Sequence, residues 1–301
     1  MPPDFMLHTV SWKSSNKQVS TDMSPPILEE ILEHLYGKYN RREFVHPDPL
    51  EFLYDYNDLH DREIAGLLAS SLAYGRVSQI NKSISIVLER MKPSPFGFLE
   101  VASMESLLRT FPSFKHRFTT GDEIAAMLFG MKSVIMKYGS LHACFKAGFI
   151  NNGESILPAI TEFVEELSSG FNCRSNSLLP SPAKGSACKR INLFLRWMVR
   201  RDDVDPGGWD DISPSNLVVP LDTHLHRICL ALGLTKRKQA DMRTALEITD
   251  SFRSVVPHDP VRYDFALTRL GIRKDTDMTS FLDECGTRTA IQYNGRRAYE
   301  A

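Results

Sequence analysis

The sequence predicts an all-α protein. Apolar residues recur at three- and four-residue spacing in most long segments, no segment alternates apolar and polar residues as a half-buried strand would, and turn residues separate the helical stretches. Of the 301 residues, 42% are hydrophobic and 24% are charged, close to the average for globular proteins. These values exclude wholesale disorder and allow a sizeable core, in one large domain or two smaller ones.

The helices are expected in a fixed order along the chain. Residues 1–23 are polar, rich in Ser and without periodicity, which predicts a flexible leader. A helix follows from Pro25 to about Tyr39, with Ser24 as its N-cap. Asp61 caps a second run, which breaks at residues 74–76 and continues through Met91 as a helical hairpin. Further helical patterns cover residues 122–138, 141–149, 155–167, 188–199, 223–232, 239–255 and 259–270.

The breaks between these segments do not by themselves divide the chain into two domains. They fall at residues 93–95, 175–184 and 202–220, where Pro and Gly gather. We therefore expect one helical domain over residues 24–272, which can consist of two lobes. Residues 273–301 lose periodicity and form a predicted C-terminal tail.

Composition also bears on compartment and partners. The five cysteines lack the spacing of a metal cluster, so we expect reduced thiols in a cytosol-like compartment. No apolar run reaches the roughly 18 to 20 residues of a spanning helix, which argues against a membrane role. A net charge of −1 argues against indiscriminate coating of nucleic acid but leaves room for a local basic surface. We expect a cytoplasmic monomer, and association with a nucleoid or nucleus is compatible with this composition.

The stretch of residues 184–201 carries most of the candidate chemistry. Small residues at Gly185, Ser186 and Ala187 let backbone N–H groups approach a phosphate where the next helix presents its positive end. The alternative is a basic helix whose apolar residues face the core while its charges are solvated. The stretch contains no acidic residue and six basic ones: Lys184, Lys189, Arg190, Arg196, Arg200 and Arg201.

A second element begins at Asp222, which stands at the start of a predicted helix. There the free N–H groups and the helix dipole stabilise a carboxylate, so its simplest role is an N-cap contributing roughly 1 kcal/mol. His224 and His226 are two positions apart and face different sides of that helix, so we expect no metal site.

An acidic loop lies between the two elements. It could repel DNA, bind a cation or stay solvated, and solvation is the expected state of its residues Asp202, Asp203, Asp205, Asp210 and Asp211.

Together the two elements resemble the helix-hairpin-helix DNA glycosylase superfamily. In that family the hairpin glycine precedes a lysine by four positions, as Gly185 precedes Lys189, and an aspartate is followed by Thr-His and an arginine, as in Asp222-Thr223-His224 with Arg227. The family's Gly/Pro-rich loop is similar to residues 205–220. Lys189 and Asp222 are separated by 33 positions, and this spacing is closest to that of the archaeal 8-oxoguanine glycosylase branch.

Within this superfamily the chain looks most like an uncharacterised bacterial family. The resemblance covers most of residues 25–272 and rests on the segments ASSLAYGR, GSACKRINLFLRWMVRRDD and PLDTHLHRICLALGLTKRKQADMRTALEITDSF. Two departures are visible: the hairpin keeps a single glycine, Gly185, and the terminal four-cysteine cluster is missing. We therefore expect no iron-sulfur centre.

The resemblance implies two helical lobes with a cleft between them and a DNA N-glycosylase that acts on a damaged, for example oxidised, base. Lys189, as a neutral amine, would attack the sugar carbon and form a Schiff base, and β-elimination would add AP-lyase activity. Asp222 would accept a proton from Lys189 or stabilise the cationic sugar. Hydrolysis by a water that Asp222 activates is the lesser variant. The partner would be duplex DNA with a flipped base.

The same resemblance suggests contacts to DNA. Tyr74 could stack on a base beside Arg76, although a buried tyrosine at a helix turn explains that position equally well. Two other functions remain open: a catalytically inactive nucleic-acid-binding module, and a helical scaffold whose basic helix meets an acidic protein. In the glycosylase hypothesis the backbone would be held by Gly185, Ser186, Ala187, Lys184 and Arg190, and Asp222 would be supported by Thr223, His224 and Arg227.

Overall fold

The computed structural model describes residues 25–169 and 177–272, together with residues 281, 283 and 285. Over these residues the chain forms twelve α-helices and one very small β-hairpin, which confirms the all-α class. The predicted leader and nearly all of the predicted C-terminal tail lie outside the described residues. None of the described helices combines the length and apolar character needed to cross a bilayer.

The helices are distributed along the whole described chain. Before residue 170 they are α1 (Pro25–Tyr39), α2 (Leu59–Leu72), α3 (Val77–Arg90), α4 (Pro95–Val101), α5 (Met104–Thr110), α6 (Gly121–Tyr138), α7 (Leu141–Asn151) and α8 (Ile156–Ser168). After it they are α9 (Lys189–Val199), α10 (Thr223–Ala231), α11 (Met242–Arg253) and α12 (Asp264–Ile272). Strands β1 (Lys115–His116) and β2 (Thr119–Thr120) pair antiparallel between α5 and α6.

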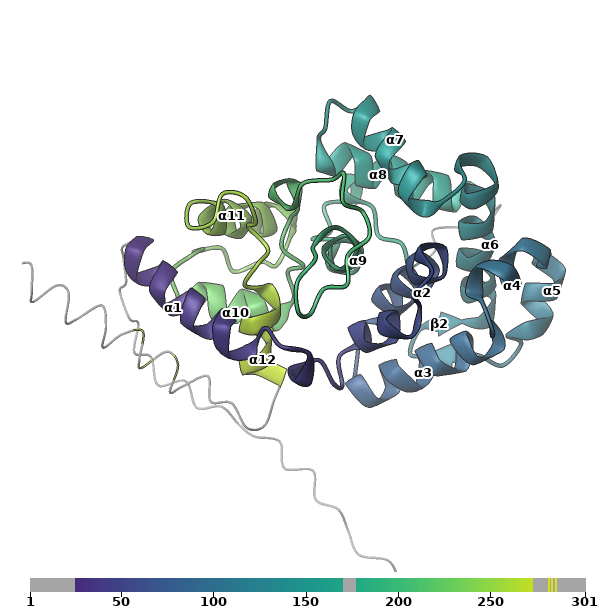
Figure 1. Ribbon diagram of the computed structural model, residues 1–301, viewed down its shortest axis with the longest axis horizontal. Coiled ribbons are helices and arrows are strands. Elements are labelled where there is room, and N and C mark those ends of the chain that lie inside the picture. Colours follow the sequence, from purple (N-terminus) through teal and green to yellow (C-terminus); the bar gives the residue numbers. More distant parts are fainter. Residues whose placement is uncertain (1–24, 170–176, 273–280, 282, 284, 286–301) are drawn as a thin grey trace, which may run out of the picture.

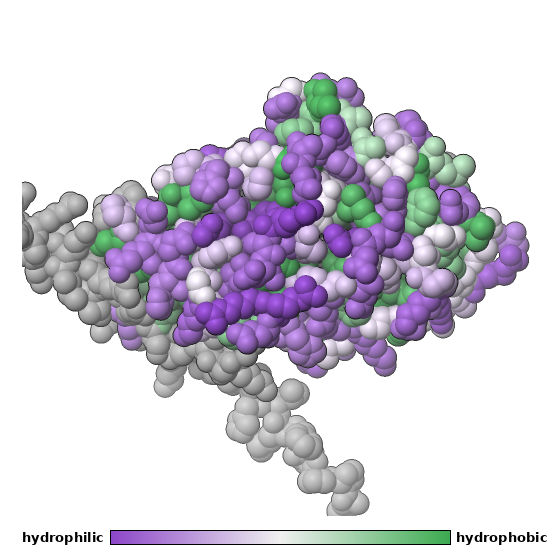
Figure 2. All heavy atoms as spheres, in the orientation of Figure 1, coloured by the Kyte–Doolittle hydropathy of each residue, from purple (hydrophilic) through white to green (hydrophobic). Residues whose placement is uncertain are grey.

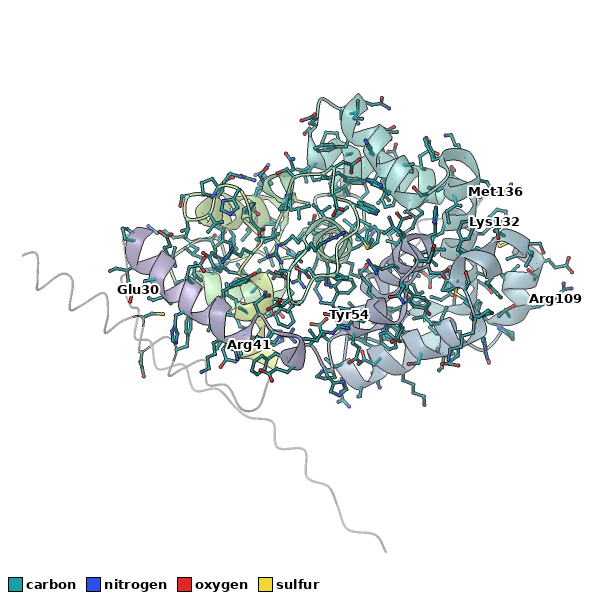
Figure 3. The ribbon with its side chains drawn as sticks, in the orientation of Figure 1. Glu30, Arg41, Tyr54, Arg109, Lys132 and Met136 are labelled. Atoms are coloured by element: carbon teal, nitrogen blue, oxygen red, sulfur yellow. The ribbon has the colours of Figure 1, made fainter. Side chains whose placement is uncertain are left out.

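Helix α9 lies in the middle of the molecule (Figure 1). Helices α1, α10, α11 and α12, here called the α10–α12 group, gather on one side of it, and α2 to α8, the α2–α8 group, on the other. Tyr54 stands near this junction (Figure 3), and its hydroxyl donates to the backbone oxygen of Val204, in the loop after α9. The face seen in this orientation is largely hydrophilic (Figure 2), as expected when helices turn their apolar sides inward.

Most predicted helices begin and end within two residues of their expected bounds, but three starts differ. The cap of α2 is Asp58, whose side chain accepts from the N–H groups of His60 and Asp61, so the prediction that Asp61 is the cap is wrong. Asp61 lies in the first turn of α2 and accepts from Phe96 N at 2.7 Å, which anchors α4. Helix α11 begins at Met242 rather than at residue 239 because Asp241 is its N-cap.

Helix α12 begins five residues later than predicted, at Asp264. Asp259, the expected first residue, instead accepts from Arg200 Nε at 3.0 Å. The helices α4 and α5 and the hairpin between α5 and α6 were not predicted. Each of these helices has seven residues, and each strand has two, which is too short for a periodic pattern to register.

The hydrophobic core is continuous and is centred on α9. Trp209, from the loop after α9, is fully buried, with its ring centroid 5.5 Å from that of Phe145 and 5.2 Å from that of Phe194. Its Nε1 donates to Glu63 Oε1 at 2.9 Å, which gives the buried indole a partner. Burial raises the pKa of Glu63 to about 7, although Trp209 and backbone N–H groups act in the opposite direction.

A buried ion-pair network joins α9 to its neighbours. Arg196 Nη2 lies 3.1 Å from Asp205, and Arg196 also pairs with Asp264 at the start of α12. Arg200, one turn later, pairs with Asp205 and Asp259. The side chain of Asp205 is 0% exposed, and that of Asp202, which also pairs with Arg200, is 15% exposed. The prediction of a solvated acidic loop is therefore wrong at these two positions. The positive charges of Arg196 and Arg200 are neutralised inside the protein and are not available to an external anion.

The later part of the acidic loop stays near the surface. Asp210 pairs with Arg201, and both side chains are more than half exposed, at 68% and 61%. Asp211 pairs with His142 and Lys146 of α7. The loop therefore changes from core to surface within a few residues, because only its first part reaches the buried face of α9.

Asp205→Asn should cost about 3–5 kcal/mol of unfolding free energy, because two buried guanidinium groups would lose their shared carboxylate. Asp210→Asn is the matched control, since it removes one partner of an exposed pair and should change stability by less than about 1 kcal/mol. Urea unfolding of both variants measures the difference. Equal losses in the two variants would show that the network does not hold α9 in place.

Candidate functional site

A pocket of about 540 Å³ lies at the N-terminal end of α9. Its walls come from the end of α2, the tip of the β1–β2 hairpin, the loop before α9, and the segments just before α10 and α11. The lining residues are 73–74, 118, 177, 180, 185–190, 221 and 240–241. Both helix groups thus contribute to one pocket, whose size is in the range of sites that hold small organic ligands.

The loop before α9 presents backbone and small side chains to this pocket. Gly185 has φ +74°, a conformation that favours glycine, and its N–H donates to Pro182 O at 2.8 Å. The backbones of Ser186 and Asp241 form an isolated antiparallel β-bridge, which connects this loop to the start of α11. Cys188 precedes α9 and offers no side-chain cap to its first turn. The positive end of α9 therefore meets the pocket without a capping side chain.

The predicted phosphate-binding residues are thus partly brought together. Gly185 and Ser186 are exposed at the pocket, whereas the side chain of Ala187 is buried. Lys184 ends a short 3-10 turn, and its side chain lies outside the described part of the chain.

Lys189 is the first residue of α9 and lines the pocket in a half-buried position. Its Nζ donates to the backbone oxygen of Ala73 at 3.2 Å. Ala73 is the C-cap of α2, where the helix dipole favours a positive charge. This contact holds the lysine amine at the pocket wall, next to the corner between α2 and α3.

Asp222 is the N-cap of α10, as predicted, and accepts from the N–H groups of His224 and Leu225, both at 2.9 Å. It is half-buried, and the preceding Leu221 lines the pocket. Asp222 and Lys189 both affect the pKa of the buried carboxyl of Asp264. Burial raises that pKa to about 6; Arg196 opposes the change, the charge of Asp222 adds to it, and Lys189 acts against it.

Lys189 and Asp222 are therefore both close enough to influence one buried carboxyl, although they come from different elements. The second oxygen of that carboxyl, Asp264 Oδ1, has no hydrogen-bond partner among the described residues. The sequence did not single out Asp264, because it falls inside a predicted helical run and nothing local marks it as buried beside a charged pair.

Arg190 and Tyr74 are engaged with the protein itself. The Arg190 guanidinium donates to Ser71 O at 3.1 Å and to Ser177 O at 2.6 Å, and it lies 5.3 Å from the centroid of the Tyr74 ring. The Tyr74 hydroxyl donates to His116 O at 2.9 Å. Tyr74 is half-buried at the turn after α2, and these contacts hold its side chain in the pocket wall.

The remaining predicted site residues lie around this centre. Thr223 and Arg227 are exposed on α10, and Arg76 is exposed at the start of α3. His224 packs against α12 so closely that a Cβ added to Gly271 would lie 2.9 Å from its Nδ1. His226 instead bonds to the backbone oxygen of Arg237. The part of the chain that the structure describes contains no group of three or more His, Cys, Asp or Glu side chains suited to a metal ion.

The fold and the pocket define an all-α protein with a lysine at the start of its central helix, on the wall of a pocket, and an aspartate that caps α10. Residues 48–273 match a family described as "Protein of unknown function (DUF2400)", and the chain belongs to this family. The matched region extends from the segment before α2 to the end of α12 and includes every residue of the pocket lining. No curated protein and no solved structure matches the chain.

Asp222→Asn should leave the unfolding free energy nearly unchanged, because asparagine caps a helix as well as aspartate does. Asp222→Ala should cost about 1 kcal/mol through loss of the cap. Asp58→Asn and Asp58→Ala are matched controls at the aspartate that caps α2. Urea unfolding compares the four variants. A large loss for Asp222→Asn would mean that the charge itself holds the fold together.

Asp264 should make stability depend on pH. Its pKa is about 6 in the folded protein, against a usual 3.8, so the folded state binds more protons between these values. The stabilisation from this additional proton is fully present below pH 3.8 and is lost as the pH rises through 6. From pH 5 to pH 8 the unfolding free energy of the wild type should fall by about 1.4 kcal/mol relative to Asp264→Asn. Urea titrations at both pH values test this, and parallel pH profiles would contradict it.

Proposed function

We propose that the protein is a base-excision-repair DNA N-glycosylase with AP-lyase activity. The observation that carries the proposal is the position of Lys189, whose amine is held at the wall of a pocket of about 540 Å³ while its charge and that of Asp222 act on the same buried carboxyl, Asp264. An amine and a carboxylate are the two groups that this chemistry needs. The arrangement of helices on either side of α9, with residues of both groups lining one pocket, is compatible with a helix-hairpin-helix glycosylase-like fold.

In the proposed reaction Lys189 is the nucleophile. After losing a proton, its Nζ attacks C1′ of the target nucleotide, the C1′–N bond breaks, and the base leaves with the bonding electrons and takes up a proton. The ring oxygen then separates from C1′ as a protonated imine forms between C1′ and Nζ. Loss of a C2′ proton expels the 3′ phosphate, and water hydrolyses the imine to restore the lysine.

Asp222 is the proposed charged partner in these steps. Its carboxylate would accept the proton from Lys189 or stabilise the positive charge that develops on the sugar. Capping bonds from His224 N and Leu225 N go to one oxygen, Oδ1, and fix the orientation of the group. Thr223, His224 and Arg227 would support this end of α10. The chemistry requires neither a metal ion nor an iron-sulfur centre, because the protein's own groups supply the nucleophile and the proton acceptor.

The proposed partner is duplex DNA with a damaged base turned out of the stack, and oxidised bases are the first class to test. Gly185 and Ser186 would approach a backbone phosphate at the positive end of α9, which has no side-chain cap. Arg76, exposed at the start of α3, would add a phosphate contact. In this proposal the protein acts as a monomer in the cytoplasm or on the nucleoid.

Borohydride trapping tests the proposal directly. Wild-type protein should form a covalent adduct on a duplex carrying 8-oxoguanine, thymine glycol, uracil or an abasic site, because reduction fixes the imine. Lys189→Gln should abolish the adduct while retaining DNA binding. Lys38→Gln, at an exposed lysine of α1 outside the pocket lining, is the matched control and should trap like the wild type.

The outcomes separate the competing functions. Folded wild-type protein that binds DNA without trapping on any of these duplexes would contradict the lyase mechanism and favour an inactive nucleic-acid-binding module. Absence of DNA binding would remove both functions and favour the helical protein-interaction scaffold.

A further inference from the structure

The tip of the β1–β2 hairpin places an aromatic side chain at the pocket. Phe118 is 78% exposed and is also one of the residues that line the pocket. Burying a phenylalanine side chain stabilises a folded protein, and an exposed Phe118 gives up most of that stabilisation. One exposed aromatic residue is not unusual by itself, but its position beside a pocket with an amine on its wall makes it a candidate for ligand contact.

The hairpin that carries Phe118 is fixed at its base from two sides. His116 and Thr119 face each other in the register of the strands, so Arg117 and Phe118 form the connecting turn. The Tyr74 hydroxyl bonds to His116 O at 2.9 Å and to Thr119 Oγ1 at 2.7 Å. On the other side, His116 Nδ1 lies 2.9 Å from Ser83 Oγ of α3.

The corner at Gly75 also lies close to the hairpin. A Cβ added to Gly75 would lie 2.8 Å from Arg117 Cδ, and Gly75 has φ +100°, a conformation that other residues rarely adopt. Arg117 itself also has a positive φ, +53°. The Phe118 side chain therefore projects from a hairpin whose strands are held by hydrogen bonds to Tyr74 and Ser83.

The surroundings of Phe118 suit a nucleic acid better than an apolar protein surface. The Arg117 guanidinium lies 5.5 Å from the centroid of the Phe118 ring, and Arg117 is exposed. Lys115 on β1 and Arg76 at the start of α3 are exposed as well. An aromatic ring beside a cation is the combination that binds single-stranded or unstacked nucleotides, in which bases stack on the ring and cations meet phosphates. An apolar protein partner would instead need a contiguous apolar patch.

We propose that Phe118 stacks on a base of the DNA next to the nucleotide that enters the pocket, and that Tyr74 supports the hairpin rather than stacking itself. The identity of the ligand as DNA rests on the proposed function. The stacking role depends on the exposed Phe118 ring and on the hairpin that holds it in place. It needs no chemistry at Lys189. It gives Tyr74 a positioning role through His116 and Thr119.

The test measures binding in a Lys189→Gln background, so that no covalent step interferes. The probe is a duplex with an abasic-site analogue and 2-aminopurine as its neighbour, whose fluorescence changes when the stacking of that base changes. Phe118→Ala should weaken binding roughly 5- to 150-fold, the range for loss of one stacked base, and should remove the fluorescence change. Phe118→Trp should keep both.

Met136→Ala is the matched control. Met136 is 77% exposed on α6 at the edge of the molecule (Figure 3) and does not line the pocket, so its truncation should change neither affinity nor fluorescence. The melting temperature of Phe118→Ala should equal that of the parent, because the side chain is mostly solvated.

Each remaining outcome decides between the two proposals. If Phe118→Ala binds as tightly as the parent, or weakens binding while the fluorescence change persists, the stacking role is wrong even when wild-type protein traps an adduct. If binding and fluorescence depend on Phe118 but wild-type protein never traps, the stacking role stands and the lyase proposal fails. If the protein does not bind the duplex, both are overturned.

Discussion

The buried ion pairs of α9 are the constraint on which the rest of the structure depends. Arg196 and Arg200 stand one turn apart, and Asp205 bridges them from the loop that follows. A buried charge without a partner costs several kcal/mol, so this loop and the start of α12 must come to α9 for the chain to fold. The network orients α9 toward the α10–α12 group, and this fixes where its N-terminal end and Lys189 lie.

The same network extends to the candidate site through Asp264. One oxygen of this carboxyl pairs with Arg196, while the other has no partner among the described residues, and the charges of Lys189 and Asp222 both act on it. The buried network and the candidate site are therefore coupled through the charges that act on Asp264. A change in its protonation alters the electric field at the lysine and the aspartate as well as the stability of the fold.

The positive charges of residues 184–201 are divided between structure and surface. Arg196 and Arg200 are neutralised in the core, Arg190 is bonded to two backbone oxygens, and Arg201 pairs with Asp210 at the surface. Lys189 remains at the pocket. Most of the basic residues in this stretch thus bind other groups of the protein itself. The proposed DNA contacts therefore lie in the loop before α9 and in the hairpin.

The sequence by itself determined the long helices and the cap of α10. The bounds of α1 and the N-cap role of Asp222 follow from local periodicity and from the free N–H groups at a helix start, which act within a few residues. The burial of Asp205, the anchoring of the hairpin that carries Phe118 and the position of Asp264 depended on tertiary structure. Arg196 and Asp264 are 68 positions apart, and contacts of that range arise only when packing brings distant segments together, so no local pattern records them.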